Sequence, residues 1–234
     1  MTRVALFRAR DAAARTAIQL RRLGFGAASA PVVEIVARPF SLRRTHYDAI
    51  VATSANAFLT NARLDMTARL YVVGARTARA AGARGWRIAA PPAADAQRLI
   101  ETLMREIAPG AHALYLAGRD RNVAVEDALG AVASLETVEA YAAEARAVWR
   151  ASEARAVAAC SVALHYSARS AGLAARLAED AGILTQFVAM RHVCLSRAAA
   201  APLIAIGAGA IFFAPTPDEH SLLAALRQAD AVFP

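Results

Sequence analysis

The sequence contains no lysine, and it has only two cysteines. All 27 basic residues are therefore arginines, and the 234-residue chain carries a net charge of +8. The complete replacement of lysine by arginine indicates a compositional bias, so the number of arginines alone does not point to a function. The positive sign still favours anionic partners, because arginine binds carboxylates and phosphates through paired hydrogen bonds. Cys160 and Cys194 have neither disulfide-framework nor metal-site spacing, and we interpret both as small buried hydrophobes.

The motifs of most cofactor and covalent enzymes are also missing. Gly207-Ala208-Gly209 lacks the third glycine of a dinucleotide-binding loop, and no phosphate-binding loop with lysine or GxSxG nucleophile motif occurs. The five histidines form no i, i+4 pair, which disfavours a zinc site. His165 and His192 lie in or beside predicted strands and are interpreted as structural residues. We therefore expect no metal and no cofactor.

Membrane segments are not expected either. Charged residues interrupt the first eleven positions, so these lack the apolar region of a signal peptide. Residues 198–217 carry no charge, but Pro202, Gly207, Gly209 and Pro215 interrupt them. This segment is predicted to form a helix, a turn and a buried strand. We expect a soluble, cytoplasmic protein.

Short apolar runs alternate with amphipathic stretches along the chain, of which 57% is hydrophobic and 20% charged. Strands that alternate with helices of 10–15 residues predict an α/β fold with parallel sheets covered on both faces. The candidate strands are Val4–Phe7, Val32–Val36, Ala49–Thr53, Tyr71–Val73, Trp86–Ala89, Ala113–Leu116, Glu136–Ala140, Ser161–Tyr166, His192–Leu195 and Ala210–Phe213.

An internal repeat indicates two small α/β domains. Residues 53–56 (TSAN) and 166–169 (YSAR) each follow an apolar run, residues 71–81 correspond to 192–202, and residues 87–103 correspond to 211–226. The C-terminal copy of the repeat has no first strand of its own that would correspond to residues 114–120 of the other copy. The N-terminal segment, with residues 5–11, is expected to supply this strand to the C-terminal domain.

The resulting domain prediction is discontinuous. One domain comprises residues 1–36 plus 141–234, and the inserted domain comprises residues 40–137. Linkers are expected at about residues 36–40 and 138–141.

Small hydroxyl residues and glycine recur where predicted strands turn into helices. These turns contain Thr53 and Ser54, Gly74 and Thr77, Ser167, and Ser196. The carboxyl ends of parallel strands form the usual ligand edge, and helix N-termini there suit carboxylates or phosphates. Ordinary N-capping explains any one turn, but four turns in two domains would converge on one cleft. A fifth turn, Thr216–Glu219, is interpreted as a structural capping box with proline at the first helical position.

Four segments in order resemble the uroporphyrinogen-III synthase family: YDAIVATSANAF (47–58), YVVGARTARAAGARGWRI (71–88), VEAY (138–141) and LHYSARSA (164–171). The resemblance covers nearly the whole chain. It implies two flavodoxin/Rossmann-like domains that face each other across a cleft and are joined by two linker strands. It also implies a cofactor-free lyase that cyclises hydroxymethylbilane, with inversion of the last pyrrole, to uroporphyrinogen III and water. The substrate is a polycarboxylate, as the positive charge would favour, and hydroxymethylbilane synthase could hand it over transiently.

The resemblance also implies site residues. Tyr141 matches the family's tyrosine at the second linker and is expected to donate a hydrogen bond to the departing hydroxyl. Substrate binding is expected at Arg8, Ser54, Thr77 and Ser167, which match family positions, and also at Thr53, Gly74 and Ser196. The chain departs from the family at residues 196–200, where SRAAA replaces the common pattern Gly-x-Thr-Thr-Ala, so both threonines are missing.

That departure keeps other functions open. The main alternative is a non-catalytic tetrapyrrole-binding or regulatory module with the same two-lobed fold. A two-lobed receptor for small anions is a third class. Nucleic-acid binding is disfavoured, because the arginines are spread through the chain without an aromatic-basic motif. We expect a monomer, because the repeat predicts few contacts between the lobes beyond the linkers.

Overall fold

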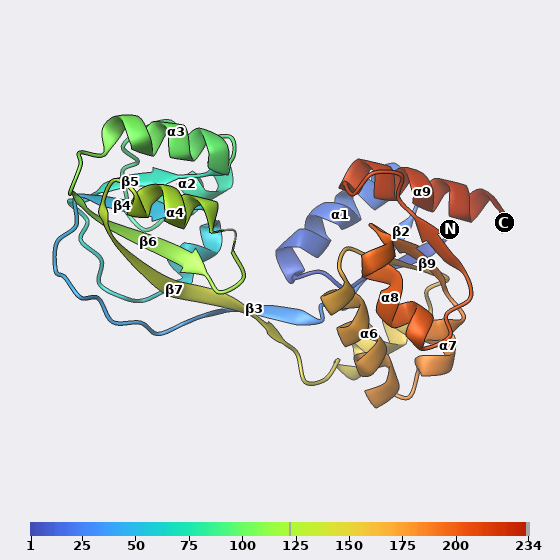
Figure 1. Cartoon of the computed structure of the whole chain (residues 1–234). Helices are drawn as coiled ribbons and strands as arrows, with labels where there is room; N and C mark the ends of the chain where they lie inside the picture. The colour runs from blue at the N-terminus through green and yellow to red at the C-terminus, as the bar shows by residue number, and fades with distance from the viewer. Residues whose placement is uncertain (122, 233–234) are drawn as a thin grey trace. The chain divides into compact units, whose positions relative to one another are not determined.

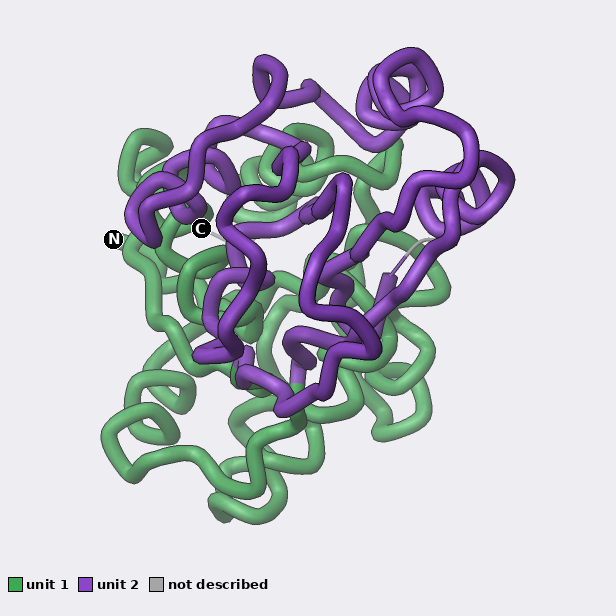
Figure 2. The backbone as a smooth tube through the Cα atoms, turned by 90° about the vertical axis from the view of Figure 1, so that its left-hand side faces the viewer, with its two compact units in different colours: residues 1–34, 144–234 green, residues 35–143 purple. Residues whose placement is uncertain are grey.

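The computed structural model describes residues 1–121 and 123–232 and contains two compact units. Unit 1 comprises Met1–Glu34 and Glu144–Pro234, and unit 2 comprises Ile35–Ala143 (Figure 2). Each unit contains one five-stranded sheet with helices on both faces (Figure 1). The α/β fold with two parallel-dominated sheets that the sequence predicts is confirmed.

The chain passes between the units within two neighbouring strands, β3 (Val33–Ala37) and β7 (Ser134–Ala145). The repeat predicts linkers at about residues 36–40 and 138–141, whereas the units divide after Glu34 and after Ala143, inside these two strands.

Unit 1 contains a parallel sheet in the order β2-β1-β8-β9-β10. Counted from the first strand of the unit, this order is 2-1-3-4-5, which is that of flavodoxin-like doubly wound sheets. The strands are β1 (Arg3–Leu6), β2 (Gly26–Ser29), β8 (Val162–His165), β9 (Arg191–Cys194) and β10 (Ile211–Phe213).

Alternate side chains of these strands enter two different cores. Val4 and Leu6 of β1 pack with α1 (Arg10–Arg22) and α9 (Glu219–Val232). Ala5 and Phe7 face the opposite side, where the remaining helices of unit 1 pack. These helices are α5 (Ala151–Ala158), α6 (Ala168–Asp180), α7 (Leu184–Val188) and α8 (Arg197–Ala205). Because both faces are covered, the strands are apolar at consecutive positions.

Unit 2 contains a sheet in the order β5-β4-β6-β7-β3, in which the pairs β4–β5, β4–β6 and β6–β7 are parallel. Its other strands are β4 (Ala49–Ala52), β5 (Arg69–Val72) and β6 (His112–Gly118). The 3₁₀ helix η1 (Ala55–Leu59) and α2 (Gly74–Gly82) cover one face. The helices α3 (Ala96–Glu106) and α4 (Ala124–Gly130) cover the other.

One predicted strand is wrong, and one strand of the structure is not predicted. Trp86–Ala89 is not a strand, since only Ile88 forms an isolated bridge, to Leu70, and Trp86 is instead buried in a core of unit 2. Conversely, the sequence does not predict β2, because its residues, GAAS, form no apolar run. Its backbone is held as an edge strand by parallel pairing with β1.

The uncharged segment 198–217 forms most of α8, a turn at Gly207 with φ of 80°, and β10, as predicted, but this strand is half-buried and not buried. Among residues 1–121 and 123–232, the helices are all too short or too polar to cross a membrane.

A pair of buried histidines interrupts the apolar core of unit 1. His192 Nε2 lies 3.0 Å from the Phe187 carbonyl oxygen, which can only accept, so this nitrogen carries the proton. His192 Nδ1 therefore accepts from His165 Nε2, at 3.0 Å. His165 Nδ1 is buried without a hydrogen-bond partner, so the expectation of two satisfied structural histidines holds only in part. Phe7 stacks on the His165 ring.

Burial lowers the pKa of both rings, that of His192 to about 4 and that of His165 well below its usual value, the latter also through the neighbouring His192. The unfolded chain therefore takes up protons as the pH falls through 6.5, whereas in the folded chain His192 stays neutral until about pH 4 and His165 also resists protonation. The free energy of unfolding of unit 1 should fall across this window, by about 3 kcal/mol for His192 alone.

We predict that His192→Gln flattens this dependence, because the amide keeps a donor and an acceptor but does not titrate. The free energy of unfolding is measured by urea unfolding between pH 7 and pH 4.5. The fluorescence of Trp149 reports on unit 1 in a Trp86→Phe background. An unchanged pH slope in the variant would show that other groups cause the acid sensitivity.

Candidate functional site

In each sheet the strand order reverses between two neighbouring strands, and the helices that follow these two strands lie on opposite faces. In unit 1 these strands are β1 and β8, followed by α1 and α6. In unit 2 they are β4 and β6, followed by η1 and α4. Ligands of doubly wound sheets bind beyond the carboxyl ends of the strands at this point. We call the edge of each sheet at which its parallel strands end the carboxyl edge.

At the carboxyl edge of unit 2, Tyr141 lies beside Gly118. The register between β6 and β7 shifts at this point, so that Ala117 pairs with Glu139 but Gly118 pairs with Tyr141. Such a bulge re-aims a side chain. The half-buried phenol ring covers Gly118 so closely that a Cβ atom there would lie 2.7 Å from the Tyr141 Cζ and 2.8 Å from its hydroxyl oxygen. Position 118 must therefore be glycine for the phenol to occupy this place.

A second tyrosine, Tyr115, lies beside this group. Its hydroxyl forms a hydrogen bond of 3.0 Å with the Thr53 hydroxyl, which follows β4. Burial raises the pKa of Tyr115, and the nearby Tyr141 phenol adds to this effect, while the hydrogen bond with Thr53 opposes it. The Thr53 and Tyr115 hydroxyls thus form one hydrogen-bonded pair, and the Tyr141 phenol lies near enough to affect the pKa of Tyr115. Sequence analysis missed Tyr115, which looks like any apolar residue of a buried strand.

An ion pair lies at the same end of β6. Arg121 contacts Glu126 at 2.8 Å and donates to the Gly118 carbonyl at 3.3 Å. The hydrogen bond with Arg121 and its charge lower the pKa of Glu126, although burial opposes this. Glu139 lies 3.5 Å from Arg119 and 3.9 Å from Arg121. Both arginines are therefore balanced by carboxylates of unit 2.

The other predicted residues of unit 2 also lie at its carboxyl edge. Ser54 caps η1, and its hydroxyl accepts from the Asn56 N–H at 3.2 Å. Gly74, at φ of 77°, starts α2 in a conformation that favours glycine, and its N–H donates to the Ala93 carbonyl. Thr77 is only 4% exposed. The turn at Gly74 therefore offers backbone groups rather than the Thr77 hydroxyl to a ligand.

In unit 1, Ser167 and Ser196 cap α6 and α8. Their hydroxyls accept from the N–H groups of Ser170 and Ala199, each at 3.2 Å. Both hydroxyls therefore serve as N-caps, and the remaining N–H groups of these helix starts are the groups that suit an anion. Of the two positions where the family pattern has threonine, Ala198 is exposed and Ala199 is buried.

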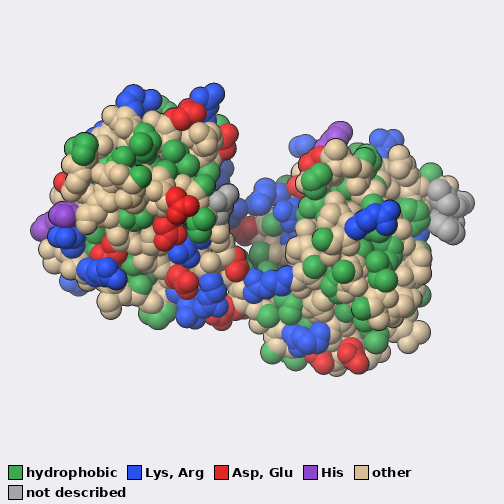
Figure 3. All heavy atoms as spheres, in the orientation of Figure 1, with side chains coloured by type: hydrophobic (Ala, Val, Ile, Leu, Met, Phe, Trp, Pro, Cys, Tyr) green, Lys and Arg blue, Asp and Glu red, His purple; other side chains and the backbone are tan. Residues whose placement is uncertain are grey.

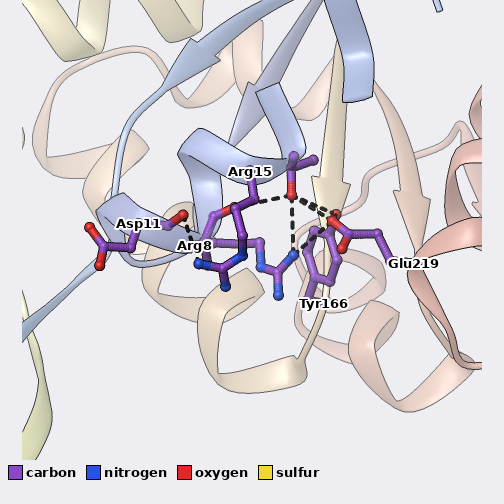
Figure 4. A network of polar contacts seen from close by, with 7 residues as sticks. Arg8, Asp11, Arg15, Tyr166 and Glu219 are labelled. Atoms are coloured by element: carbon purple, nitrogen blue, oxygen red, sulfur yellow. Dashed lines mark hydrogen bonds and ion pairs between the residues drawn. The ribbon is translucent and has the colours of Figure 1, made fainter. Parts of the chain in front are cut away.

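Arg8, which follows β1, belongs to a polar network within unit 1 (Figure 4). Its guanidinium lies 3.9 Å from the centroid of the Tyr166 ring and contacts Glu219 at 2.8 Å. Burial above all raises the pKa of Tyr166 to about 12, so its hydroxyl stays protonated and donates to Glu219 at 2.9 Å.

The interpretation of Thr216–Glu219 as a capping box is wrong. Asp218 caps α9, because its carboxylate accepts from the Ser221 N–H at 2.8 Å. Pro217 therefore precedes the cap, and Glu219 is the first residue of the helix. The side chain of Glu219 does not fold back onto the helix start but reaches Arg8, a partner 211 positions away that local sequence cannot reveal.

Arginine and acidic side chains are intermingled on the face shown in Figure 3. Among the described residues, no three His, Cys, Asp or Glu side chains are grouped so that they could hold a metal ion.

The family model described as uroporphyrinogen-III synthase HemD matches residues 14–224. The fold resembles that of uroporphyrinogen-III synthetase from Helicobacter pylori 26695, with a TM-score of 0.60 at 15% identity, covering 97% of this chain and 99% of that chain. A mutant uroporphyrinogen III synthase from Thermus thermophilus matches with a TM-score of 0.49 at 18% identity, covering 99% and 100% of the two chains. No curated protein matches the sequence.

The contact between Tyr141 and Gly118 leads to a prediction. Gly118→Ala should destabilise unit 2 by about 1–3 kcal/mol, because the new methyl group overlaps the phenol ring. In a Tyr141→Ala background the same substitution should be nearly neutral. Urea unfolding of the four proteins of this double-mutant cycle measures the difference. Equal destabilisation in both backgrounds would show that Gly118 is required for its backbone and not for the ring.

Proposed function

The chain belongs to the uroporphyrinogen-III synthase family, and from that premise we propose that it cyclises hydroxymethylbilane to uroporphyrinogen III and water. In this reaction the last pyrrole, ring D, is inverted. The activity would place the protein in porphyrin and haem biosynthesis as a lyase.

The main support from the structure is the Tyr141 phenol. It lies in β7 beside the carboxyl end of β6, one of the two strands beyond which doubly wound sheets bind ligands, and Gly118 leaves space for its ring. A phenol can donate a hydrogen bond to a departing hydroxyl group. Tyr141 is therefore proposed as the catalytic residue.

The chemistry requires little more than positioning and one proton donor. The hydroxyl of ring A leaves as water when it accepts a proton, which produces an azafulvenium cation. Ring D attacks this cation through its substituted carbon to form a spiro intermediate. The intermediate fragments, recloses with ring D inverted and releases a proton, so that the reaction is balanced with water as the only by-product. The pyrroles supply the electrons, and no metal or cofactor is required.

The second task of the protein is to hold a flexible polycarboxylate in one geometry. We assign substrate binding to the predicted residues at the two carboxyl edges, which are Arg8, Thr53, Ser54, Gly74, Thr77, Ser167 and Ser196. At Thr77 and at the two capping serines of unit 1, burial and existing hydrogen bonds favour contacts through the backbone. Thr53 keeps a side-chain role, since Tyr115 fixes the position of its hydroxyl.

Several finer expectations stay predictions. The protein is expected to act as a cytoplasmic monomer and to receive its substrate from hydroxymethylbilane synthase by transient hand-over. It is not expected to bind nucleic acid or membranes.

The activity has a direct test. The protein should convert freshly made hydroxymethylbilane to isomer III in excess of isomer I, whereas the bilane alone closes to isomer I. Chromatographic separation of the oxidised porphyrin isomers measures the ratio. Binding of the porphyrin without any excess of isomer III would instead support the alternative, a non-catalytic tetrapyrrole-binding module.

Tyr141→Phe tests the catalytic assignment. The variant keeps the aromatic ring over Gly118 but loses the donor, so isomer III formation should fall about 10²- to 10⁴-fold. The spontaneous route is unaffected, and the product therefore shifts toward isomer I while the melting temperature changes little.

Tyr71→Phe is the matched control, because it removes the hydroxyl of a second tyrosine of unit 2, which contacts Glu106 at 3.2 Å. It should keep the isomer ratio of the unmodified protein. Isomer III formation by folded Tyr141→Phe at the unmodified rate would overturn the role of the phenol as proton donor.

A further inference from the structure

One carboxylate oxygen of unit 1 accepts three hydrogen bonds from three different parts of the fold. Glu219 Oε1 lies 2.8 Å from Arg8 Nη1, 2.5 Å from Thr16 Oγ1 and 2.9 Å from the Tyr166 hydroxyl (Figure 4). Arg8 follows β1, Thr16 belongs to α1, and Tyr166 follows β8. The three donors converge on the place of one carboxylate group.

The three donors are held in place by contacts that do not involve Glu219. The Arg8 guanidinium stacks on the Tyr166 ring, and its Nη1 donates to the Thr16 hydroxyl at 3.1 Å. Thr16 is fully buried, and its hydroxyl also lies 3.2 Å from the Ala12 carbonyl oxygen of its own helix. Arg8, Thr16 and Tyr166, which we call the carboxylate cradle, would therefore persist if Glu219 left.

The carboxylate cradle lies where the fold of unit 1 is expected to bind a ligand. Arg8 lies two residues after β1 and Tyr166 directly follows β8, and the connections of these two strands diverge to opposite faces of the sheet. The side chains of Arg8 and Glu219 are 27% and 32% exposed, so the group is accessible to solvent.

Glu219 can leave the carboxylate cradle without unfolding its helix. It is the first residue of α9, whose N-terminus is capped by Asp218 and not by Glu219. The residues that precede it, 215–218, are exposed. A change of side-chain rotamer therefore moves the carboxylate to solvent while the helix keeps its cap.

We propose that the carboxylate cradle of Arg8, Thr16 and Tyr166 is a subsite for one carboxylate of the substrate, and that Glu219 occupies it until the substrate displaces it. This inference rests on the proposed function, because that function supplies a polycarboxylate substrate. The exchange replaces one carboxylate by another, so the donors are satisfied in both states. Glu219 competes with the ligand and lowers its apparent affinity by the fraction of time that it occupies the subsite.

The sign of an affinity change tests this competition. Uroporphyrin III, the stable oxidised form of the product, serves as the carboxylate probe, and its binding is measured by fluorescence titration without turnover. Glu219→Gln removes the competing charge and should lower the Kd several-fold, up to about tenfold. Arg8→Gln and Tyr166→Phe each remove a donor and should raise the Kd about tenfold.

Asp180→Asn is the matched control. It changes the net charge of unit 1 by the same amount and breaks an exposed ion pair, of 2.9 Å with Arg176, at the last residue of α6. Its Kd should match that of the unmodified protein. A Kd lowered equally by Asp180→Asn would mean that net charge, and not the subsite, causes the effect, which overturns the inference.

An unchanged or raised Kd in Glu219→Gln would also overturn the inference, since a residue that orients Arg8 for the ligand would have that effect. If Glu219→Gln does not fold, Glu219→Asp keeps a negative charge at the start of α9 but shortens the reach by one methylene, and it should lower the Kd as well. Failure of all proteins to bind the probe would equally contradict a subsite. A missing excess of isomer III would instead contradict the proposed function alone, because probe binding does not require turnover.

Discussion

Coverage of both sheets by helices on both faces is the constraint on which the rest of the structure depends. It leaves no solvent-facing side on β4, whose four residues AIVA are all buried, or on β8. Polar side chains are thereby displaced to the strand ends, so that Thr53 and Ser54 follow β4, and Tyr166 and Ser167 follow β8. Because the strands are parallel, these ends share one edge of each sheet. The packing of the core thus determines where the polar chemistry can be.

The histidine pair shows what polar side chains require when they lie inside a sheet that is covered on both faces. His165 and His192 lie within β8 and β9, and each ring is neutral because burial lowers its pKa by disfavouring the charged form. The two rings satisfy one another and the Phe187 carbonyl, but the Nδ1 atom of His165 has no hydrogen-bond partner. Polar groups inside these sheets therefore need dedicated partners, whereas groups at the carboxyl edge are closer to solvent, where a partner can be exchanged.

Features set by local sequence are predictable, and features set by distant partners are not. Apolar runs locate most strands, and recurring hydroxyl residues locate the turns at the carboxyl edges. Strand β2 escapes prediction because GAAS has no apolar signal and depends on pairing with β1. Glu219 resembles part of a helix cap in the sequence, since its partners Arg8 and Tyr166 lie 211 and 53 positions away. The role of Tyr115 likewise depends on Thr53, which reaches it only through the neighbouring strand.

The hydrogen bonds that the hydroxyl groups already form distinguish recognition by backbone groups from recognition by side chains. Ser54, Ser167 and Ser196 already accept hydrogen bonds from helix N–H groups, so an anion at these turns meets the remaining backbone donors. In the proposed function, side-chain recognition is therefore concentrated in two places, around Arg8 in unit 1 and around Tyr141 and the Thr53–Tyr115 pair in unit 2. Backbone donors bind any carboxylate with little selectivity, whereas the two side-chain clusters have fixed geometry. A reaction whose electrons come from the substrate needs that geometry more than it needs a nucleophile, and a sequence without a nucleophile motif or a zinc-ligand pair is consistent with the same requirement.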